Sequence, residues 1–153
     1  MTIYHGSYTS VKEPKIIQGK FTKDFGDGFY CTMISKQAIR WANKYDTPTL
    51  SKFDYSPTEE LDILEFKELT DEWLDFITNC RAGKSHNHDI VIGAMADDQI
   101  YNYVADYIAG VINREQFWAL AKFKYPTHQI CFHTEKALKS LTFINSEECS
   151  YEA

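Results

Sequence analysis

Residues whose side chains could bind a ligand gather near the amino end of the chain. Tyr4-His5-Gly6-Ser7 lies close to the start, Gly26-Asp27-Gly28-Phe29-Tyr30 follows it, and Trp41 comes eleven positions after Tyr30. A histidine can hydrogen-bond sugar hydroxyls, and a glycine lets a ligand approach the backbone closely. Aromatic faces stack on a flat cation and shield it from water. The pattern therefore predicts a site for a flat, positively charged ring attached to a ribose.

Strands and helices must hold these residues, and the sequence predicts both. Apolar and alternating runs predict strands at residues 3–7, 29–33, 49–55, 61–66, 89–95, 128–133 and 141–145. Helical spacing and capping residues predict helices from Ser35 to Pro48, from Thr70 to Gly83, from Asp97-Asp98 to Gly110, from Asn113 onward, and over residues 134–139. The polar tail from Ser146 is expected to fray. Because the helices fall between strands without strict alternation, we expect an α+β fold with antiparallel or mixed sheets.

Length, charge and cysteine usage limit the classes of protein to consider. The 153 residues suit one domain over 1–153, and the chain is 44% apolar and 15% aromatic, which is typical of a globular core. Its net charge of -6 argues against a non-specific nucleic-acid binder, which needs a basic surface. The four cysteines lack Cys-x-x-Cys spacing and are expected to be reduced and mostly buried. Without a signal peptide or a long apolar run, we expect a cytoplasmic protein with no membrane segment.

The motifs near the amino end resemble those of the ADP-ribosyltransferases, in the branch of diphtheria toxin and the poly(ADP-ribose) polymerases. His5-Gly6-Ser7 matches the first motif of that family, and Gly26-Asp-Gly28-Phe29-Tyr30 matches its second, a Gly-x-Gly-apolar-Tyr strand. Trp41 stands where the family has a second aromatic residue, usually tyrosine, and Gln129 stands where it has a glutamate at the start of a late strand. The resemblance is good over the first 45 residues, loose at the late strand and slight between them.

This resemblance implies a fold, a substrate and a reaction. The implied fold is ADP-ribosyltransferase-like, with two packed, mostly antiparallel sheets and flanking helices. The implied reaction is cleavage of the nicotinamide–ribose bond of NAD and transfer of ADP-ribose to a protein, nucleic acid or small acceptor, and the uncharged Gln129 favours transfer of a single unit over polymer elongation. The implied NAD-binding residues are His5, Gly6, Ser7, Tyr30 and Trp41, and the implied catalytic residues are Gln129, His5 and Tyr30. Similarity to small bacterial members further implies a toxin with an antitoxin partner.

The uncharged Gln129 keeps a second hypothesis open. In the family the glutamate bonds the ribose of nicotinamide and stabilises the positive charge that develops as the bond breaks. Glutamine can make the hydrogen bond but carries no charge, so the alternative is a non-catalytic module that binds NAD or ADP-ribose. A third hypothesis is an interaction domain without a nucleotide pocket. Glu135 lies nearby but fits better in the first turn of a helix.

Three other groups of residues were considered for chemistry. His86 and His88 with Asp89 resemble metal ligands, but no third ligand has diagnostic spacing, so we expect no metal. Cys31 with His5 would suit a thiol hydrolase. Neighbouring strand residues point to opposite faces, however, so Cys31 should not share a pocket with Tyr30. Asp97-Asp98 is expected to begin a helix, where carboxylates favour the positive end of the dipole.

Overall fold

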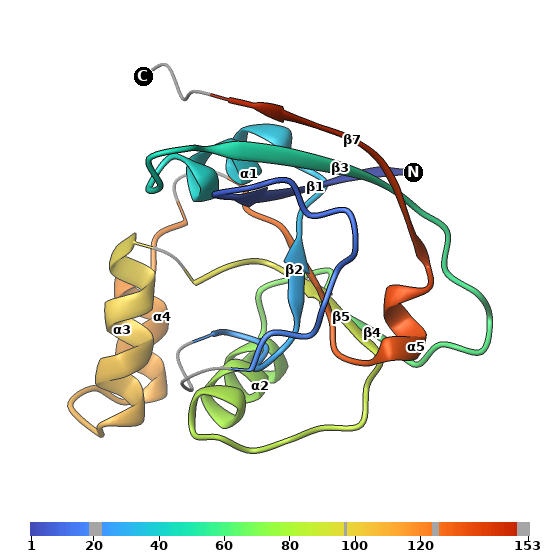
Figure 1. Cartoon of the computed structure of the whole chain (residues 1–153). Helices are drawn as coiled ribbons and strands as arrows, with labels where there is room; N and C mark the ends of the chain where they lie inside the picture. Colours follow the sequence, from blue (N-terminus) through green and yellow to red (C-terminus); the bar gives the residue numbers. More distant parts are fainter. Residues whose placement is uncertain (19–22, 97, 124–125, 150–153) are drawn as a thin grey trace.

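The computed structural model describes residues 1–18, 23–96, 98–123 and 126–149 (Figure 1). Its elements in chain order are β1 (Thr2–Ser7), β2 (Phe29–Cys31), α1 (Ser35–Ala42), β3 (Thr49–Tyr55), β4 (Ile63–Glu65), α2 (Asp71–Arg81), β5 (Ile90–Gly93), α3 (Asp98–Ile108), α4 (Arg114–Leu120), β6 (Gln129–Phe132), α5 (Glu135–Leu138) and β7 (Leu141–Glu148).

The strands form two sheets. One has the order β1-β3-β7 and the other β2-β6-β5-β4. Every pairing is antiparallel except that of β4 with β5. An isolated bridge joins the sheets where Tyr4 N donates to Thr32 O (2.8 Å) and Thr32 N donates to Tyr4 O (2.9 Å). The predicted α+β class with two mostly antiparallel sheets is confirmed, and the first two strands lie side by side.

Two apolar cores hold the layers together. The first lies between the sheets, where Phe29 of β2 packs edge-to-face on Phe53 of β3, with ring centres 5.8 Å apart. The second lies between the β2-β6-β5-β4 sheet and helices α2, α3 and α4 (Figure 1). Its centre is the fully buried Trp73, whose indole N–H donates to Ala94 O (3.0 Å). Burying these large aromatic side chains is the main favourable contribution to folding.

The capping residues explain where most helices begin. Thr70 accepts from Trp73 N, Asn113 and Gln116 form a reciprocal capping box, and Thr134 accepts from Ala137 N. These starts confirm the sequence prediction. The prediction that Ser35 caps α1 is wrong, because Ile34 holds that position without a side-chain bond.

The structure also corrects where several predicted strands and helices begin or end. The prediction that the chain frays from Ser146 is wrong for residues 146–148, because β7 runs on to Glu148 and pairs with the start of β3 at Thr49; residues 150–153 lie outside the described part of the chain. The predicted strands at residues 61–66 and 89–95 are shorter, and Asp97 lies outside the described residues. Helix α1 ends at Ala42, so Tyr45 follows the helix instead of belonging to it.

Gly6 allows α1 to lie against β1. A Cβ atom on Gly6 would come within 1.9 Å of the carbonyl oxygen of Ala38 and 3.0 Å of the backbone nitrogen of Ala42. Both alanines are fully buried. A side chain at position 6 would push the helix off the strand, and such overpacking lowers the stability of a fold. The same helix carries Trp41, so Gly6 fixes the place of that ring.

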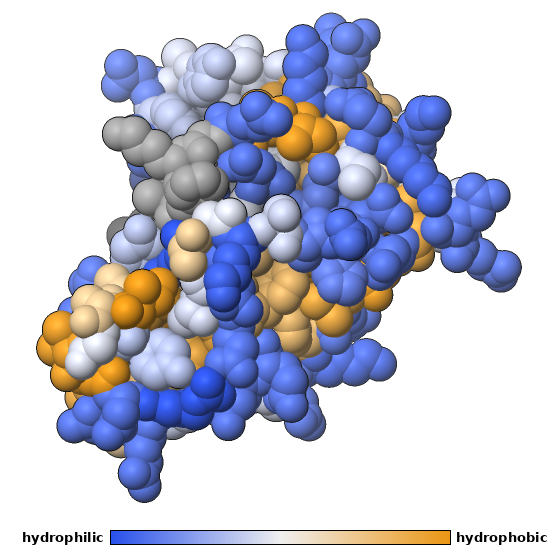
Figure 2. Space-filling model, turned by 90° about the horizontal axis from the view of Figure 1, so that it is seen from below, coloured by the Kyte–Doolittle hydropathy of each residue, from blue (hydrophilic) through white to orange (hydrophobic). Residues whose placement is uncertain are grey.

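An apolar area of the surface lies over α3 and α4, which lie side by side (Figure 1) and carry orange side chains in Figure 2. Exposed apolar side chains there are Ile108, Val111 and Leu120. Within the described residues, none of the helices has the length and apolar character needed to cross a membrane.

Candidate functional site

One cavity collects all of the site residues predicted from the sequence. Its volume is about 810 Å³, within the range of small-molecule sites. It lies at the end of β1, beside β2, α1 and the start of β6. The predicted residues that line it are His5, Gly6, Ser7, Tyr30, Trp41 and Gln129. All of them but Gln129 lie within the first 41 residues, so the fold brings the start of the late strand to the motifs near the amino end.

His5 is held as a neutral ring. Its Nδ1 lies 2.6 Å from the carbonyl oxygen of Tyr30, and its ring stacks on Phe29 with centres 4.3 Å apart. Because a carbonyl oxygen can only accept, Nδ1 carries the proton and Nε2 is the acceptor nitrogen. Burial lowers the pKa of His5, which favours this neutral form. The ring is therefore suited to accept a hydrogen bond from a hydroxyl group.

Tyr30 is anchored by the turn that precedes it. Its hydroxyl donates to Gly26 O (2.7 Å) and accepts from Phe25 N (3.1 Å). Gly26 has φ of 86°, which a glycine adopts without steric cost. Burial raises the pKa of Tyr30 well above its usual value, so the phenol stays neutral. The bonded hydroxyl gives Tyr30 a fixed aromatic wall in the cavity, and no acid–base role follows from it.

Trp41 provides a second aromatic wall from α1. Tyr30 and Trp41 both line the cavity, and no ring contact joins these two described residues. Helix α1 is tied to the start of β6 by Gln37, whose amide donates to His128 O and whose Oε1 accepts from His128 N (3.0 Å). This clamp fixes the helix that carries Trp41 relative to the strand that begins at Gln129.

The amide of Gln129 has a fixed orientation. The side chain is buried, and its Nε2 donates to Asp24 Oδ2 (3.0 Å) and to Ala94 O (3.3 Å). Both amide hydrogens are therefore directed at these acceptors. The orientation makes Oε1 the end of the amide that is suited to accept a hydrogen bond from a ligand.

Asp24 is the principal site residue that sequence analysis missed. It lines the cavity, its carboxylate accepts from Ala96 N (2.7 Å) and Gln129, and it forms an ion pair with Arg81. The Asp24 and Arg81 side chains are 7% and 5% exposed, so this is a buried pair. The guanidinium of Arg81 also stacks over Tyr101, 4.0 Å from the ring centre. Neither spacing nor neighbouring residues distinguish Asp24 in the sequence.

The histidines considered for metal binding form a ring cluster instead. Among the described residues, no group of three or more His, Cys, Asp or Glu has the geometry to hold a metal ion. The ring of His86 lies 5.4 Å from that of His88 and 4.3 Å from that of His133. His133 Nδ1 donates to Asp27 O (2.8 Å), in the turn that leads to Tyr30. His133 therefore supports the site from outside the cavity, through its bond to this turn.

Cys31 is not among the residues that line the cavity. Its side chain is fully buried, and burial raises the pKa of its thiol well above the usual value. A thiol of this kind is a poor nucleophile. All four cysteines are free, and three of them are buried.

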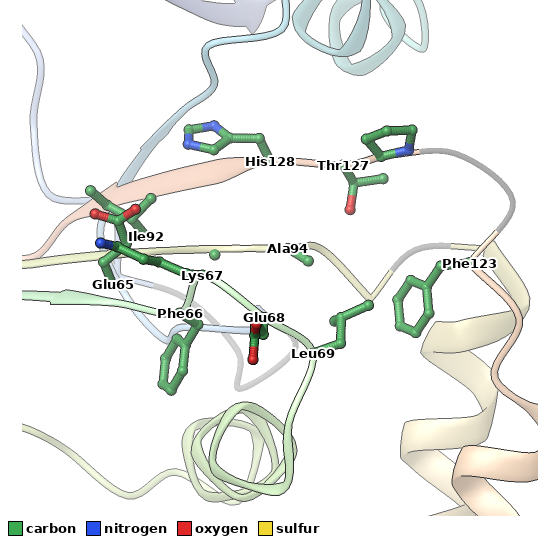
Figure 3. Close-up of a pocket in the computed structure, with 12 residues that line it drawn as sticks. Glu65, Phe66, Lys67, Glu68, Leu69, Ile92, Ala94, Phe123, Thr127 and His128 are labelled. Atoms are coloured by element: carbon green, nitrogen blue, oxygen red, sulfur yellow. The ribbon is translucent and has the colours of Figure 1, made fainter.

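A second cavity, of about 600 Å³, lies across the ends of β4, β5 and β6. Figure 3 shows His128 and Thr127 along one side of it and Glu68 and Leu69 along the other. Two of its polar groups bind backbone, since His128 Nδ1 accepts from Met33 N (3.1 Å) and Thr127 Oγ1 accepts from Met95 N (2.9 Å). No described residue lines both cavities.

The chain belongs to the family described as "Protein of unknown function (DUF3990)", whose model matches residues 1–143. The matched region contains every described residue that lines the first cavity. No curated protein and no solved structure matches the chain. The family gives no activity, so the function must be argued from the cavity itself.

The burial of His133, whose ring bonds the turn at Asp27, predicts that the protein loses stability in mild acid. Burial lowers the pKa of His133 from 6.5 to about 4. Between these values the unfolded chain binds a proton that the folded chain does not, so the free energy of unfolding falls as the pH falls. His133→Asn keeps an N–H donor for Asp27 O and removes the titration. Denaturant unfolding at several pH values should show a smaller loss in the variant, by up to about 3 kcal/mol. Equal pH slopes would contradict this assignment.

Proposed function

We propose that the chain is an NAD-dependent ADP-ribosyltransferase with an ADP-ribosyltransferase-like fold. The single observation that carries the proposal is the convergence of His5, Tyr30, Trp41 and Gln129 on one cavity. Each stands at a motif position of that family, and Gln129 is far from the other three in the chain. The bridge that joins the two sheets beside His5 supports the same fold.

The proposed binding roles follow from the geometry of each residue. His5 Nε2 accepts from a hydroxyl of the adenosine ribose, and the backbone of Gly6 and Ser7 bonds the carboxamide of nicotinamide. Tyr30 and Trp41 flank the cationic ring, each face contributing ~0.5–2 kcal/mol. Two fixed rings also keep water away from the bond that breaks.

The proposed reaction breaks the bond between the nicotinamide nitrogen and C1′ of the ribose. The electron pair of the bond leaves with nicotinamide, which becomes neutral, and the ribose takes up the positive charge. A nucleophilic atom of the acceptor then bonds C1′ and loses its proton to solvent. Gln129 Oε1 accepts from the 2′-hydroxyl of this ribose, and that hydrogen bond strengthens as positive charge develops.

Asp24 compensates in part for the missing charge at position 129. Its carboxylate binds the amide nitrogen of Gln129 at 3.0 Å, and such a bond draws electron density toward the amide oxygen. The oxygen that faces the ribose is therefore more negative than that of an isolated amide. In this proposal Asp24 is a positioning residue that acts through Gln129.

A non-catalytic module that binds NAD or ADP-ribose is the second candidate. The observation that favours it is the same uncharged Gln129, whose amide hydrogens are both bonded within the protein. In such a module Gln129 would be a structural residue, and its truncation would leave ligand binding unchanged.

The proposal extends to the acceptor and to a partner. The acceptor receives one ADP-ribose and is a protein, a nucleic acid or a small molecule. Resemblance to small bacterial transferases supports a cytoplasmic toxin that an antitoxin protein holds inactive.

Release of nicotinamide from NAD tests the activity. The wild-type chain, incubated with labelled NAD and cell lysate, should release nicotinamide and label an acceptor. His5→Ala should lower kcat/KM by about 10- to 100-fold, because a ribose hydrogen bond is lost. His88→Asn, outside the cavity, is the matched control and should behave as wild type. Binding without release, unaffected by Gln129→Ala, would favour the module. If the chain neither binds NAD nor releases nicotinamide, both proposals are overturned.

Exchanging the charges of the Asp24–Gln129 pair tests the role of Asp24. Gln129→Glu alone introduces the glutamate of the ADP-ribosyltransferases but places two carboxylates next to each other. It should lower the free energy of unfolding by roughly 3 kcal/mol and should not raise activity. Asp24→Asn together with Gln129→Glu returns one amide and one carboxylate to the pair. The double variant should recover nicotinamide release relative to Gln129→Glu when both are assayed below their melting temperatures, although the double variant does not regain stability because Arg81 loses its ion-pair partner. An active, stable Gln129→Glu single variant would contradict this role for Asp24.

A further inference from the structure

The first cavity has a positively charged wall that the proposed roles do not use. Among the described residues that line it, three are lysines, namely Lys15, Lys23 and Lys44, and the acidic ones are Glu13 and Asp24. Because Asp24 is paired with the buried Arg81, Glu13 is the carboxylate that remains to offset the lysines. The described residues of this wall therefore carry a net charge of about two positive units at neutral pH.

This charge is unusual for the chain as a whole, whose net charge is -6. Within the described part of the chain, none of the three lysines lies within 4.0 Å of a carboxylate. Burial lowers the pKa of Lys23, and repulsion from Lys44 lowers it further. Two ammonium groups that repel one another across a cavity would both be stabilised by an anion between them.

Both ammonium groups are held weakly in the structure. Lys23 Nζ lies 5.8 Å from the centre of the Tyr30 ring, and Lys44 Nζ lies 5.2 Å from that of Tyr45. These distances are near the outer limit of a cation–π contact. A flexible lysine can therefore leave its ring for a stronger ionic partner, and the departure of Lys23 would uncover the face of Tyr30.

We infer that Lys15, Lys23 and Lys44 form a subsite for the diphosphate group of a nucleotide ligand. A dinucleotide diphosphate carries one negative charge on each phosphate, which matches the net charge of the wall. The lysines adjoin the other site residues in the chain, since Lys23 precedes Asp24 and Lys44 follows Trp41 by three positions. The inference rests on the proposed function for the nicotinamide end of the ligand, but the diphosphate contact itself requires no chemistry.

Calorimetry with ADP, inorganic pyrophosphate and adenosine tests the subsite. ADP should bind the wild-type chain, and adenosine should bind about 10-fold or more weakly, because a charge-assisted contact is worth that much. Pyrophosphate should bind less tightly than ADP, since it lacks the adenosine contacts. Added salt should lower the affinity for ADP and leave the affinity for adenosine unchanged. Equal affinities for ADP and pyrophosphate would identify a free-anion site and overturn the nucleotide assignment.

Single lysine variants localise the contact. Lys23→Met and Lys44→Met should each reduce ADP affinity by roughly 10-fold without affecting adenosine. Lys36→Met removes the same charge from the exposed side of α1, outside the cavity, and should bind ADP as wild type does. Lys44 is itself exposed, so its replacement does not disturb the core. Wild-type ADP affinity in the folded Lys44→Met and Lys23→Met variants would overturn the inference.

The subsite and the transferase can fail separately. Lysine-dependent ADP binding without cleavage of NAD would support the subsite and refute the transferase. Cleavage of NAD with KM unchanged in both lysine variants would support the transferase and refute the subsite.

Discussion

The carboxylate of Asp24 bonds three segments that are far apart in the sequence. It joins Arg81 at the end of α2, the backbone of Ala96 before α3, and Gln129 at the start of β6. A buried ion pair gains little over apolar packing, but loss of one partner typically costs ~3–5 kcal/mol. The part of the first cavity formed by Asp24, Ala96 and Gln129 therefore depends on this one carboxylate, which also sets the orientation of the Gln129 amide.

Close backbone contacts fix the part of the cavity wall that β1, β2 and α1 form. The bridge between Tyr4 and Thr32 sets β1 beside β2, and the absence of a side chain on Gly6 lets α1 lie against β1. These contacts place His5 and the two aromatic walls before any ligand arrives. A preformed site of this kind loses little conformational entropy when it binds. The charged wall differs, because its lysines are long, flexible and loosely held.

Features encoded within a few residues were predictable from the sequence. The caps at Thr70 and Asn113 are local hydrogen bonds, and the candidate site residues follow short motifs. The pair of Asp24 and Arg81 was not predictable, because its members are 57 positions apart and each has an ordinary local context. The strand beyond Ser146 was missed for a similar reason, since its polar residues are ordered by pairing with β3 and not by their own propensity.

A crystal structure of the chain with bound NAD is the most direct test of this account. It should show the nicotinamide ring between Tyr30 and Trp41, its ribose at Gln129, and the diphosphate against Lys23 and Lys44. Dinucleotide bound in the second cavity, beside Glu68 and His128, would contradict the account. So would a structure at saturating NAD in which the first cavity holds no dinucleotide.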